Sequence, residues 1–503
     1  MKKIKNALIS VYYKDGLDEI VRTLHQLGVN LYSTGGTQNF IESLGIPVQA
    51  VESLTGYPSI LGGRVKTLHP KVFGGILRRS GNPTDLKELE TYSIPEIDLV
   101  IVDLYPFEET IKSGAGAEEI TEKIDIGGIS LIRAAAKNYR DVIIVPSVDD
   151  YPMLQRLLDE KQGYSEESDR KAFAGRAFAV SSWYDSAIYS WMAGDEAMLR
   201  LRSGFRKPLR YGENPHQKGI FHGNLEEVFA QLNGKELSYN NLLDLDAALN
   251  LISEFNSCCF AILKHNNACG IACRETLSDA YKAALEADPL SAFGGVLACN
   301  RTVDLQTATL VNDLFFEVLI APDFEESALE ILRSRKNRII LQLRAGVFPE
   351  KQYKTILNGI LEQDRDIYDI RAESFQLVTE KHPTAEETAD LVFANKIAKH
   401  TRSNAIVLVK NQQLVASGIG QTSRVDALKQ AIAKAGEHKF SLAGAVMASD
   451  AFFPFSDSVQ AAHEAGITAI VQPGGSVRDQ DSIDYCNKEG ISMVFTGIRH
   501  FKH

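Results

Sequence analysis

The sequence predicts an α/β protein with an N-terminal parallel-sheet domain and a larger C-terminal α/β region. Over the first ~150 residues, short β-rich runs alternate with helical patterns, which is typical of parallel βαβ units. After residue 206 the alternation resumes with longer apolar runs. The chain has 503 residues, too many for one compact core, so more than one domain is expected.

In the N-terminal domain, strands are predicted at 7–11, 29–33 and 99–104, a helix at 16–27, and a last run at 141–146 closes the unit. The stretch 151–204 is polar and helical, with an exposed turn predicted at 164–170. A domain boundary is placed near 195–205. This gives two domains, 1–200 with a helical linker and 201–503.

The C-terminal region carries predicted strands near 259–263, 296–299, 405–409, 443–447 and 469–471. Two similar halves within 206–503 are one reading of this pattern, because each half has an apolar strand followed by a small, polar loop. The segment 325–369 is charged and mixed, and no topology is predicted for it.

The composition of the chain argues against a nucleic-acid-binding protein, a membrane protein and a secreted protein. Hydrophobic residues make up 44% and charged residues 24%, as in an ordinary globular protein. A net charge of −11 without a basic tract argues against nucleic-acid binding. No apolar stretch reaches the ~18–20 residues that span a bilayer. The six cysteines lack Cys-x-x-Cys spacing and no secretory signal precedes them, so we expect a reduced, cytoplasmic protein that does not bind membranes.

A polar cluster follows the apolar run at 260–263. Lys264, His265, Asn266 and Asn267 come directly after this predicted buried strand. Ligands in open α/β sheets bind beyond the carboxyl ends of strands, and histidine is the side chain that titrates nearest neutral pH. A polar sheet edge is the simpler interpretation of any one pair, but four such groups together favour a catalytic site.

Three stretches of the N-terminal domain suit an anionic substrate. Ser33-Thr34-Gly35-Gly36-Thr37 lies between a strand and a helix, where it predicts an anion cradle or an ordinary helix cap. The run 62–70 places Arg64, Lys66 and Thr67 after two glycines, and such donors suit a phosphate or an oxyanion. Tyr105, Asp125 and Lys137 could converge from three loops for acid–base chemistry.

The C-terminal region has further candidates. The loop 209–217, with Arg210 and Tyr211, is either a rigid interdomain turn or a ligand clamp. The glycine loop 417–426 is a second predicted anion site, and 449–455 places three aromatic residues beside an acid after a strand. His463-Glu464 and Cys269…Cys273 do not have the spacing of a zinc deaminase, so no catalytic metal is expected.

Eight stretches in order resemble one family. They are GGRVKTLHP at 62–70, IDIGG at 124–128, RAAAKN at 133–138, RYGENPHQ at 210–217, LSYNN at 237–241, KHNN at 264–267, GQTSR at 420–424 and SDAFFPF at 449–455. Together they resemble the bifunctional family that joins phosphoribosylaminoimidazolecarboxamide (AICAR) formyltransferase to IMP cyclohydrolase.

The resemblance implies a fold and two activities. The N-terminal domain would be methylglyoxal-synthase-like and would close the purine ring. The C-terminal region would consist of two cytidine-deaminase-like, zinc-free subdomains and would transfer a formyl group from 10-formyltetrahydrofolate to the 5-amino group of AICAR. The substrates would be AICAR, formyl-AICAR, IMP and folate, and the chain would form a homodimer that shares the formyl-transfer site.

The resemblance also assigns roles to residues. For formyl transfer, the catalytic matches are Lys264, His265 and Asn404, and the substrate contacts are Arg210, Tyr211, Asn241, Phe293, Glu317, Arg424 and Phe453. For cyclisation, the catalytic matches are Lys66, Tyr105, Asp125 and Lys137, and the nucleotide contacts are Ser10, Lys14, Ser33, Thr34, Gly35, Gly36, Thr37, Arg64, Thr67 and Gly127.

Some positions depart from the family pattern. Tyr12 and Tyr13 replace Ser-Asp in the first loop, Ala268 replaces a common proline, and Asp103 replaces a common asparagine. The substitutions at Tyr12 and Asp103 motivate an alternative, a transformylase whose N-terminal domain binds nucleotide without efficient cyclisation. A nucleotide-binding regulator without turnover is the non-enzymatic alternative, and the Lys264-His265 pair argues against it.

Overall fold

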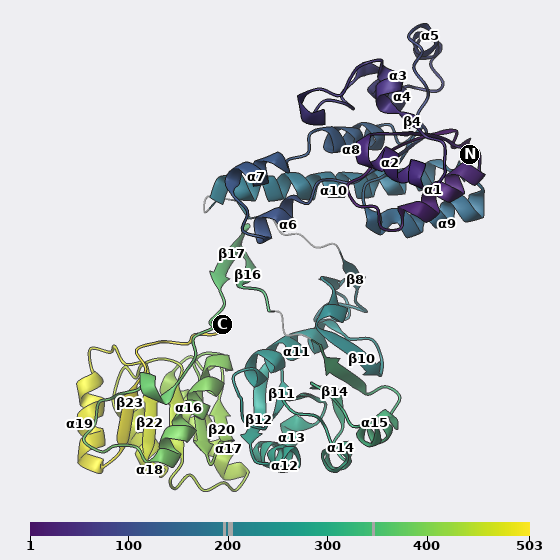
Figure 1. Cartoon of the computed structure of the whole chain (residues 1–503). Coiled ribbons are helices and arrows are strands. Elements are labelled where there is room, and N and C mark those ends of the chain that lie inside the picture. Colours follow the sequence, from purple (N-terminus) through teal and green to yellow (C-terminus); the bar gives the residue numbers. More distant parts are fainter. Residues whose placement is uncertain (195–197, 200–204, 345–347) are drawn as a thin grey trace. The chain divides into compact units, whose positions relative to one another are not determined.

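The computed structural model describes residues 1–194, 198–199, 205–344 and 348–503. The chain divides into two compact units, Met1–Arg202 and Ser203–His503, here named unit 1 and unit 2. Each unit is built around its own main sheet (Figure 1).

A parallel sheet forms the centre of unit 1. In the described residues it has five strands in the order β4-β3-β2-β5-β6, and every neighbouring pair is parallel. The strands are β2 (Asn6–Ser10), β3 (Asn30–Ser33), β4 (Gln49–Ala50), β5 (Leu99–Val102) and β6 (Ile143–Val145). The predicted strands of this domain are therefore confirmed, with bounds shifted by at most two residues.

Helices cover both faces of this sheet because successive strand side chains point to opposite sides. Ala7 and Ile9 pack on the face of α1 (Leu17–Gln26), α2 (Gly35–Ser43) and α9 (Tyr151–Lys161). Leu8 packs on the opposite face, with α3 (Val51–Thr55), α4 (Pro70–Leu77), α8 (Gly127–Lys137) and α10 (Glu167–Ala193). The remaining elements are α5 (Pro83–Thr91), α6 (Phe107–Lys112), α7 (Ala117–Glu122), and β1 (Lys2–Lys3) paired with β7 (Tyr164–Ser165).

The exposed turn predicted at 164–170 is wrong. Residues 164 and 165 form β7, and α10 begins directly afterwards with a capping box between Glu166 and Asp169. Arg170 is buried, and its guanidinium donates to the carbonyl oxygens of Tyr139 and Ser165, both at 2.9 Å. The run of charged residues suggested solvent, but here a capping box and a buried, hydrogen-bonded arginine begin a helix.

Unit 2 contains a mixed sheet of two matching halves. In the described residues it has twelve strands in the order β10-β15-β14-β13-β11-β12-β20-β19-β21-β22-β23-β18. The first six are β10 (Phe229–Asn233), β15 (Ile339–Leu343), β14 (Phe316–Ala321), β13 (Gly295–Cys299), β11 (Cys259–Lys264) and β12 (Asn267–Cys273). The others are β20 (Gln413–Gly418), β19 (Ile406–Lys410), β21 (Val446–Ser449), β22 (Ala469–Gln472), β23 (Ser492–Phe495) and β18 (Gln376–Leu377).

The two halves share one topology. Starting from the central β12–β20 pair, which is joined at Ala272 and Gln413, each half reads outward as antiparallel, antiparallel, parallel, parallel, antiparallel. The five strands predicted for this region are confirmed. The pairing strand β12 is absent from the predictions, because its alanines, cysteines and glycine lack the β-branched residues that mark a strand.

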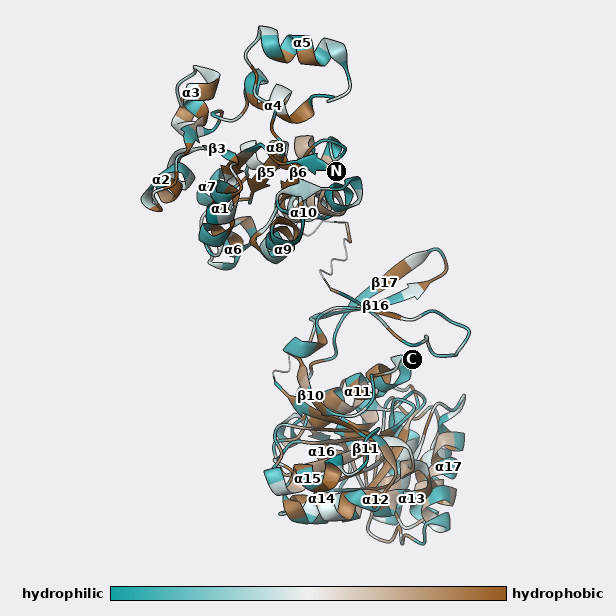
Figure 2. Cartoon of the chain, turned by 90° about the vertical axis from the view of Figure 1, so that its right-hand side faces the viewer, coloured by the Kyte–Doolittle hydropathy of each residue, from teal (hydrophilic) through white to brown (hydrophobic). Residues whose placement is uncertain are grey.

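Helices sandwich the unit 2 sheet. One face carries α11 (Tyr239–Ile252) and α16 (Ala385–His400), one from each half. The other face carries α12 (Leu277–Ala287), α14 (Leu305–Asn312) and α15 (Glu326–Arg333) in the first half, and α17 (Arg424–Glu437), α18 (Asp457–Glu464) and α19 (Asp479–Glu489) in the second. The strands between them are largely hydrophobic (Figure 2). Two short elements, α13 (Pro289–Ala292) and the pair β8 (Arg206–Pro208) with β9 (Ile220–His222), complete the unit.

The segment 325–369, for which no topology is predicted, forms α15, β15 and a hairpin. The hairpin strands are β16 (Lys351–Ile356) and β17 (Gly359–Asp364), and every residue of both is exposed. The exposed residues include several hydrophobic ones, which are visible in Figure 2. Because both strands are exposed, the hairpin contributes no residue to the core of unit 2, and charged and apolar residues occur side by side in it.

Candidate active sites

The order of the strands in unit 1 places one crevice at the carboxyl ends of β2 and β5. The chain leaves β2 towards β3 and β4 on one side, and later returns to form β5 and β6 on the other. Such a topological switch point is where open α/β sheets bind ligands. The loops that leave β2, β3 and β5 here begin with Ser10, Ser33 and Asp103.

The predicted anion cradle lies at the start of α2. The hydroxyls of Ser33 and Thr37 are occupied internally, by the carbonyl oxygens of Ile9 at 2.7 Å and Val11 at 2.9 Å. Ser10 Oγ lies 3.0 Å from Thr34 Oγ1. Thr34 is the N-cap but makes no side-chain capping bond, so backbone N–H groups at this helix start remain available to an anion.

Lys66 lies over this cradle. A Cβ added at Gly35 would be 3.1 Å from Lys66 Nζ, so the missing side chain makes room for the ammonium group. A Cβ at Gly127 would be 3.0 Å from Thr67 Oγ1, which places the next turn beside the same loop. Arg64 points to an exposed ion pair with Glu122. The loop 64–67 therefore joins the cradle to the turn before α8.

Asp125 is the buried acid of this group. Its Oδ1 accepts a hydrogen bond from Gly128 N at 2.7 Å, and its own N–H donates to Tyr184 Oη at 2.7 Å. Burial raises its pKa, the bond from Gly128 opposes that rise, and the charge of Asp103 adds to it. Burial, with a contribution from Asp125, also raises the pKa of Tyr105. Perturbed acids in a strand-end crevice are typical of catalytic groups.

Two predicted residues of unit 1 are placed differently. Lys137 is exposed at the last turn of α8, about 15 Å along the helix from the Gly127 end, and the structure does not bring it to Asp125 within the chain. Lys14 donates to the carbonyl oxygens of Val11 and Tyr12, and burial lowers its pKa. The ammonium group of Lys14 therefore stabilises the loop to which Lys14 itself belongs.

In unit 2 the Lys264-His265 pair occupies the tight turn between β11 and β12. His265 and Asn266 have φ values of 50° and 64°, a left-handed conformation that is uncommon outside glycine. The turn is held by Asp244 of α11, whose Oδ1 accepts from Asn266 N at 2.6 Å. Lys264 Nζ donates to the carbonyl oxygen of Phe293, and His265 is exposed.

Asp244 is a residue that the sequence prediction missed. Burial raises its pKa, while the N–H of Asn266 and the charges of His265 and Lys264 work in the opposite direction. The second half of the sheet has an equivalent contact. Asp390 of α16 accepts hydrogen bonds from the backbone N–H groups of Asn411 and Gln412 in the β19–β20 turn. An acid in the second turn of a helix before each hairpin is the signal that could have identified it.

One hydrogen bond connects this turn to the segment of the second half that leads to Asn404. Asn267 Oδ1 accepts from Arg402 N at 3.0 Å. Arg424 Nη2 donates to Asn404 Oδ1 at 2.9 Å and to buried Asp450 at 2.8 Å. The turn after β11 is thus bonded to the backbone of Arg402, two residues before Asn404, while Lys264 Nζ is bonded to Phe293.

The other predicted contacts of unit 2 differ in their surroundings. Phe293 is exposed and stacks on Phe315 at 4.9 Å, and Glu317 pairs with Lys235 at 2.6 Å beside a cavity of about 350 Å³. Arg210 and Tyr211 lie on the β8–β9 connection, and Asn241 closes the capping box of α11. Phe453 is fully buried in the core between β21 and α18, where its side chain is not available to a ligand.

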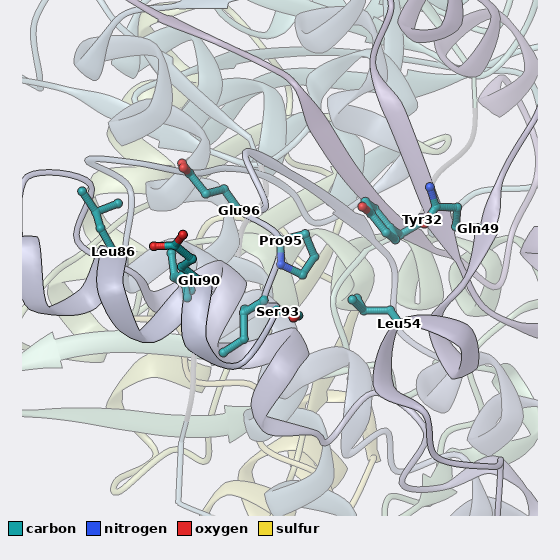
Figure 3. A pocket seen from close by; sticks show the side chains of 10 residues that line it. Tyr32, Gln49, Leu54, Leu86, Glu90, Ser93, Pro95 and Glu96 are labelled. Carbon is teal, nitrogen blue, oxygen red and sulfur yellow. The ribbon is translucent and has the colours of Figure 1, made fainter.

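A pocket of about 540 Å³ in unit 1 contains none of the predicted residues. It lies between Tyr32 and Gln49 of β3 and β4, Leu54 of α3 and the segment 86–96 (Figure 3). In the described part of the chain, no three His, Cys, Asp or Glu side chains gather as metal ligands would. Over the same residues, no helix has the length and apolar character needed to cross a membrane.

Comparison with known proteins gives two family matches and full-length relatives. Residues 135–434 match the AICARFT/IMPCHase bienzyme model, and residues 16–130 match the MGS-like domain model. The bifunctional purine biosynthesis protein PurH of Bacteroides thetaiotaomicron is 59% identical over 503 residues, 100% of this chain and 99% of the relative. PurH of Aquifex aeolicus is 48% identical over 511 residues, 99% of this chain and 100% of the relative.

Proposed function

The chain belongs to the AICARFT/IMPCHase bienzyme family, and we propose that unit 1 closes the purine ring while unit 2 transfers the formyl group. The enzyme is an AICAR formyltransferase and IMP cyclohydrolase that carries out the last two steps of de novo IMP synthesis. The family implies 10-formyltetrahydrofolate as the formyl donor. The match of residues 16–130 to the MGS-like model lies wholly within unit 1 and supports this division, with domains at 1–200 and 201–503.

The observation that carries the assignment in unit 2 is the turn of Lys264 and His265 in left-handed conformation, bonded through Asn267 to the backbone of Arg402, two residues before Asn404. In this assignment the 5-amino nitrogen of AICAR attacks the formyl carbon and gives its proton to His265. Lys264 and Asn404 stabilise the charge on the tetrahedral oxygen. The formyl C–N bond to folate then breaks, and the folate nitrogen takes up a proton as tetrahydrofolate leaves.

The assignment in unit 1 rests on Lys66 over the cradle beside buried Asp125. The carboxamide nitrogen of formyl-AICAR attacks the formyl carbon, and Lys66 stabilises the oxyanion. Asp125 and Tyr105 move the protons that allow the oxygen to leave as water. The cradle at 33–37 with Ser10, Arg64, Thr67 and Gly127 holds the anionic nucleotide.

Four further features belong to the proposal. Unit 2 has two cytidine-deaminase-like halves without zinc, supported by their shared topology. Formyl transfer needs no catalytic metal, since amine attack and proton transfer suffice. The enzyme is a cytoplasmic homodimer, and the free state of all six cysteines supports a reducing compartment. The exposed hairpin β16–β17 supports a second copy as its cover, because an isolated two-stranded sheet is marginal in water.

One assay tests the division of labour. Purified enzyme receives AICAR and 10-formyltetrahydrofolate, tetrahydrofolate release is followed, and the purine product is identified by chromatography. His265→Ala should stop tetrahydrofolate release while added formyl-AICAR is still cyclised. Lys66→Ala should release tetrahydrofolate but accumulate formyl-AICAR. If either substitution abolishes the opposite step, the assignment of sites to units is wrong.

A further inference from the structure

Two loops meet across the switch point of unit 1. The loop after β2 contains Tyr12, Tyr13 and Lys14, and the loop after β5 begins with Asp103 and leads to Tyr105. These loops leave neighbouring parallel strands at the same edge of the sheet. Their connection therefore decides the shape of the crevice in which the cyclisation site is assigned.

Asp103 clamps the first loop with both carboxylate oxygens. Its Oδ1 accepts from Tyr12 N, and its Oδ2 accepts from Tyr13 N at 3.0 Å. Asp103 is only 8% exposed, and its two hydrogen bonds to the loop are partly buried. The other side of the same loop is bonded to the cradle, because Thr37 Oγ1 accepts from Val11 N at 3.1 Å and donates to Val11 O.

The clamp requires a carboxylate. An asparagine of the same shape has one acceptor oxygen, and its NH₂ group would face the second backbone N–H without an acceptor between them. A buried N–H left in that way is costly. An aspartate at position 103 therefore accepts from both backbone N–H groups of the loop, whereas an asparagine would accept from only one.

The loop held by this clamp carries an aromatic ring to Tyr105. The rings of Tyr12 and Tyr105 lie 5.8 Å apart at 78°, an edge-to-face contact. Lys123 Nζ lies 5.9 Å from the Tyr12 ring. Tyr12 and Tyr105 are 46% and 44% exposed, so neither ring is fixed by a core and each depends on its neighbours for its orientation.

We propose that Asp103 and Tyr12 are positioning residues of the cyclohydrolase: Asp103 holds the loop after β2, and Tyr12 on that loop orients the ring of Tyr105. The inference rests on the assignment of Tyr105 to the cyclisation site. The backbone N–H of Tyr13 is held by Asp103, but its side chain has no part in the proposal, since the hydroxyl donates to Glu109 at 3.1 Å.

The test measures cyclisation of formyl-AICAR and formyl transfer separately for each variant of the full-length enzyme. Asp103→Asn should lower kcat for cyclisation by about 10-fold or more, since a displacement near 1 Å can cost up to about 100-fold. The KM for formyl-AICAR should stay within about threefold because the cradle remains in place. Tyr12→Ala should lower kcat by about fivefold, and Tyr12→Phe, which keeps the ring, should restore it.

Asp98 supplies a matched control at the opposite end of β5. Its Oδ2 accepts from the backbone N–H groups of Lys5 and Asn6, at 2.9 and 3.1 Å. Asp98→Asn should lower the melting temperature without changing kcat for cyclisation.

Three outcomes would decide against the proposal or its basis. Wild-type kcat in folded Asp103→Asn and Tyr12→Ala variants overturns it. The proposal is also overturned if Asp98→Asn loses cyclisation to the same extent, or if the Asp103 and Tyr12 variants lose formyl transfer as much as cyclisation. General destabilisation of the protein would then explain the loss. Wild-type kcat in Tyr105→Phe would instead show that the site assignment itself is wrong.

Discussion

Gly128→Ala is a sharp test of the assigned cyclisation site. Gly128 is the second residue of α8, and its N–H donates to Asp125 Oδ1 at 2.7 Å. A Cβ added at this position would lie 3.0 Å from Asp125 Cγ and closer still to Oδ2. Ordinary carbon contacts begin near 3.5 Å, so the carboxylate must move by about 0.5 to 1 Å.

The expected loss follows from that displacement. Misplacing a catalytic group by about 1 Å can cost 100-fold, so kcat for cyclisation should fall by about 10- to 100-fold, which is about 1.4 to 2.7 kcal/mol in barrier height. The fold should be little affected, because alanine is favoured over glycine in a helix by about 1 kcal/mol.

The assay follows conversion of formyl-AICAR to IMP, with formyl transfer by unit 2 as an internal reference. Gly175→Ala is the matched control, since this glycine is exposed in α10 and a Cβ there meets nothing within 4 Å. A folded Gly128→Ala enzyme that cyclises at the wild-type rate would refute the role given to Asp125.

Three other predictions concern unit 2. Arg424→Lys should lower formyl transfer by about 10-fold or more and leave cyclisation unchanged, because lysine cannot bond Asn404 and Asp450 together as the guanidinium does; an unchanged rate of tetrahydrofolate release would contradict the assignment. Phe453→Leu should cost about 1–3 kcal/mol of stability in urea unfolding without raising the KM for AICAR, because the ring is in the core; a raised KM with unchanged stability would return Phe453 to the substrate site. Glu254→Gln should cost about 3–5 kcal/mol at pH 7, since it breaks a buried contact with Lys399 at 2.8 Å and His400 at 2.9 Å. Burial opposes the ionised form of Glu254, but the bonds from His400 and Lys399 outweigh it and hold its pKa below the ordinary value. Its stabilisation is therefore complete above the unfolded-state pKa of about 4.3 and is lost as the pH falls through the folded-state pKa. The difference between wild type and Glu254→Gln should stay constant from pH 7 to about pH 5 and shrink below about pH 4.3, and a difference that stays constant below that pH would contradict this.

The amino-acid sequence was sufficient for the α/β class, for nine of the seventeen strands described in the two main sheets, and for the family. An apolar run such as Leu99–Val102 can be recognised as a strand from its sequence, because a strand covered on both faces needs an uninterrupted hydrophobic segment. The family motifs are local as well, since each is a loop whose residue types are set by a nearby strand or helix end. Strand β12 escaped prediction because pairing with β11, and not its own composition, makes it a strand.

Only the tertiary structure decided which side chains meet. The exposure of Lys137 and the burial of Phe453 depend on neighbours distant in sequence. Asp244 beside Asn266 and Asp103 beside Tyr12 are separated by 22 and 91 positions, and nothing in either local stretch specifies its partner. A periodic pattern tells which face of an element is buried, whereas a hydrogen bond between two loops exists only after the sheet has placed their strand ends side by side.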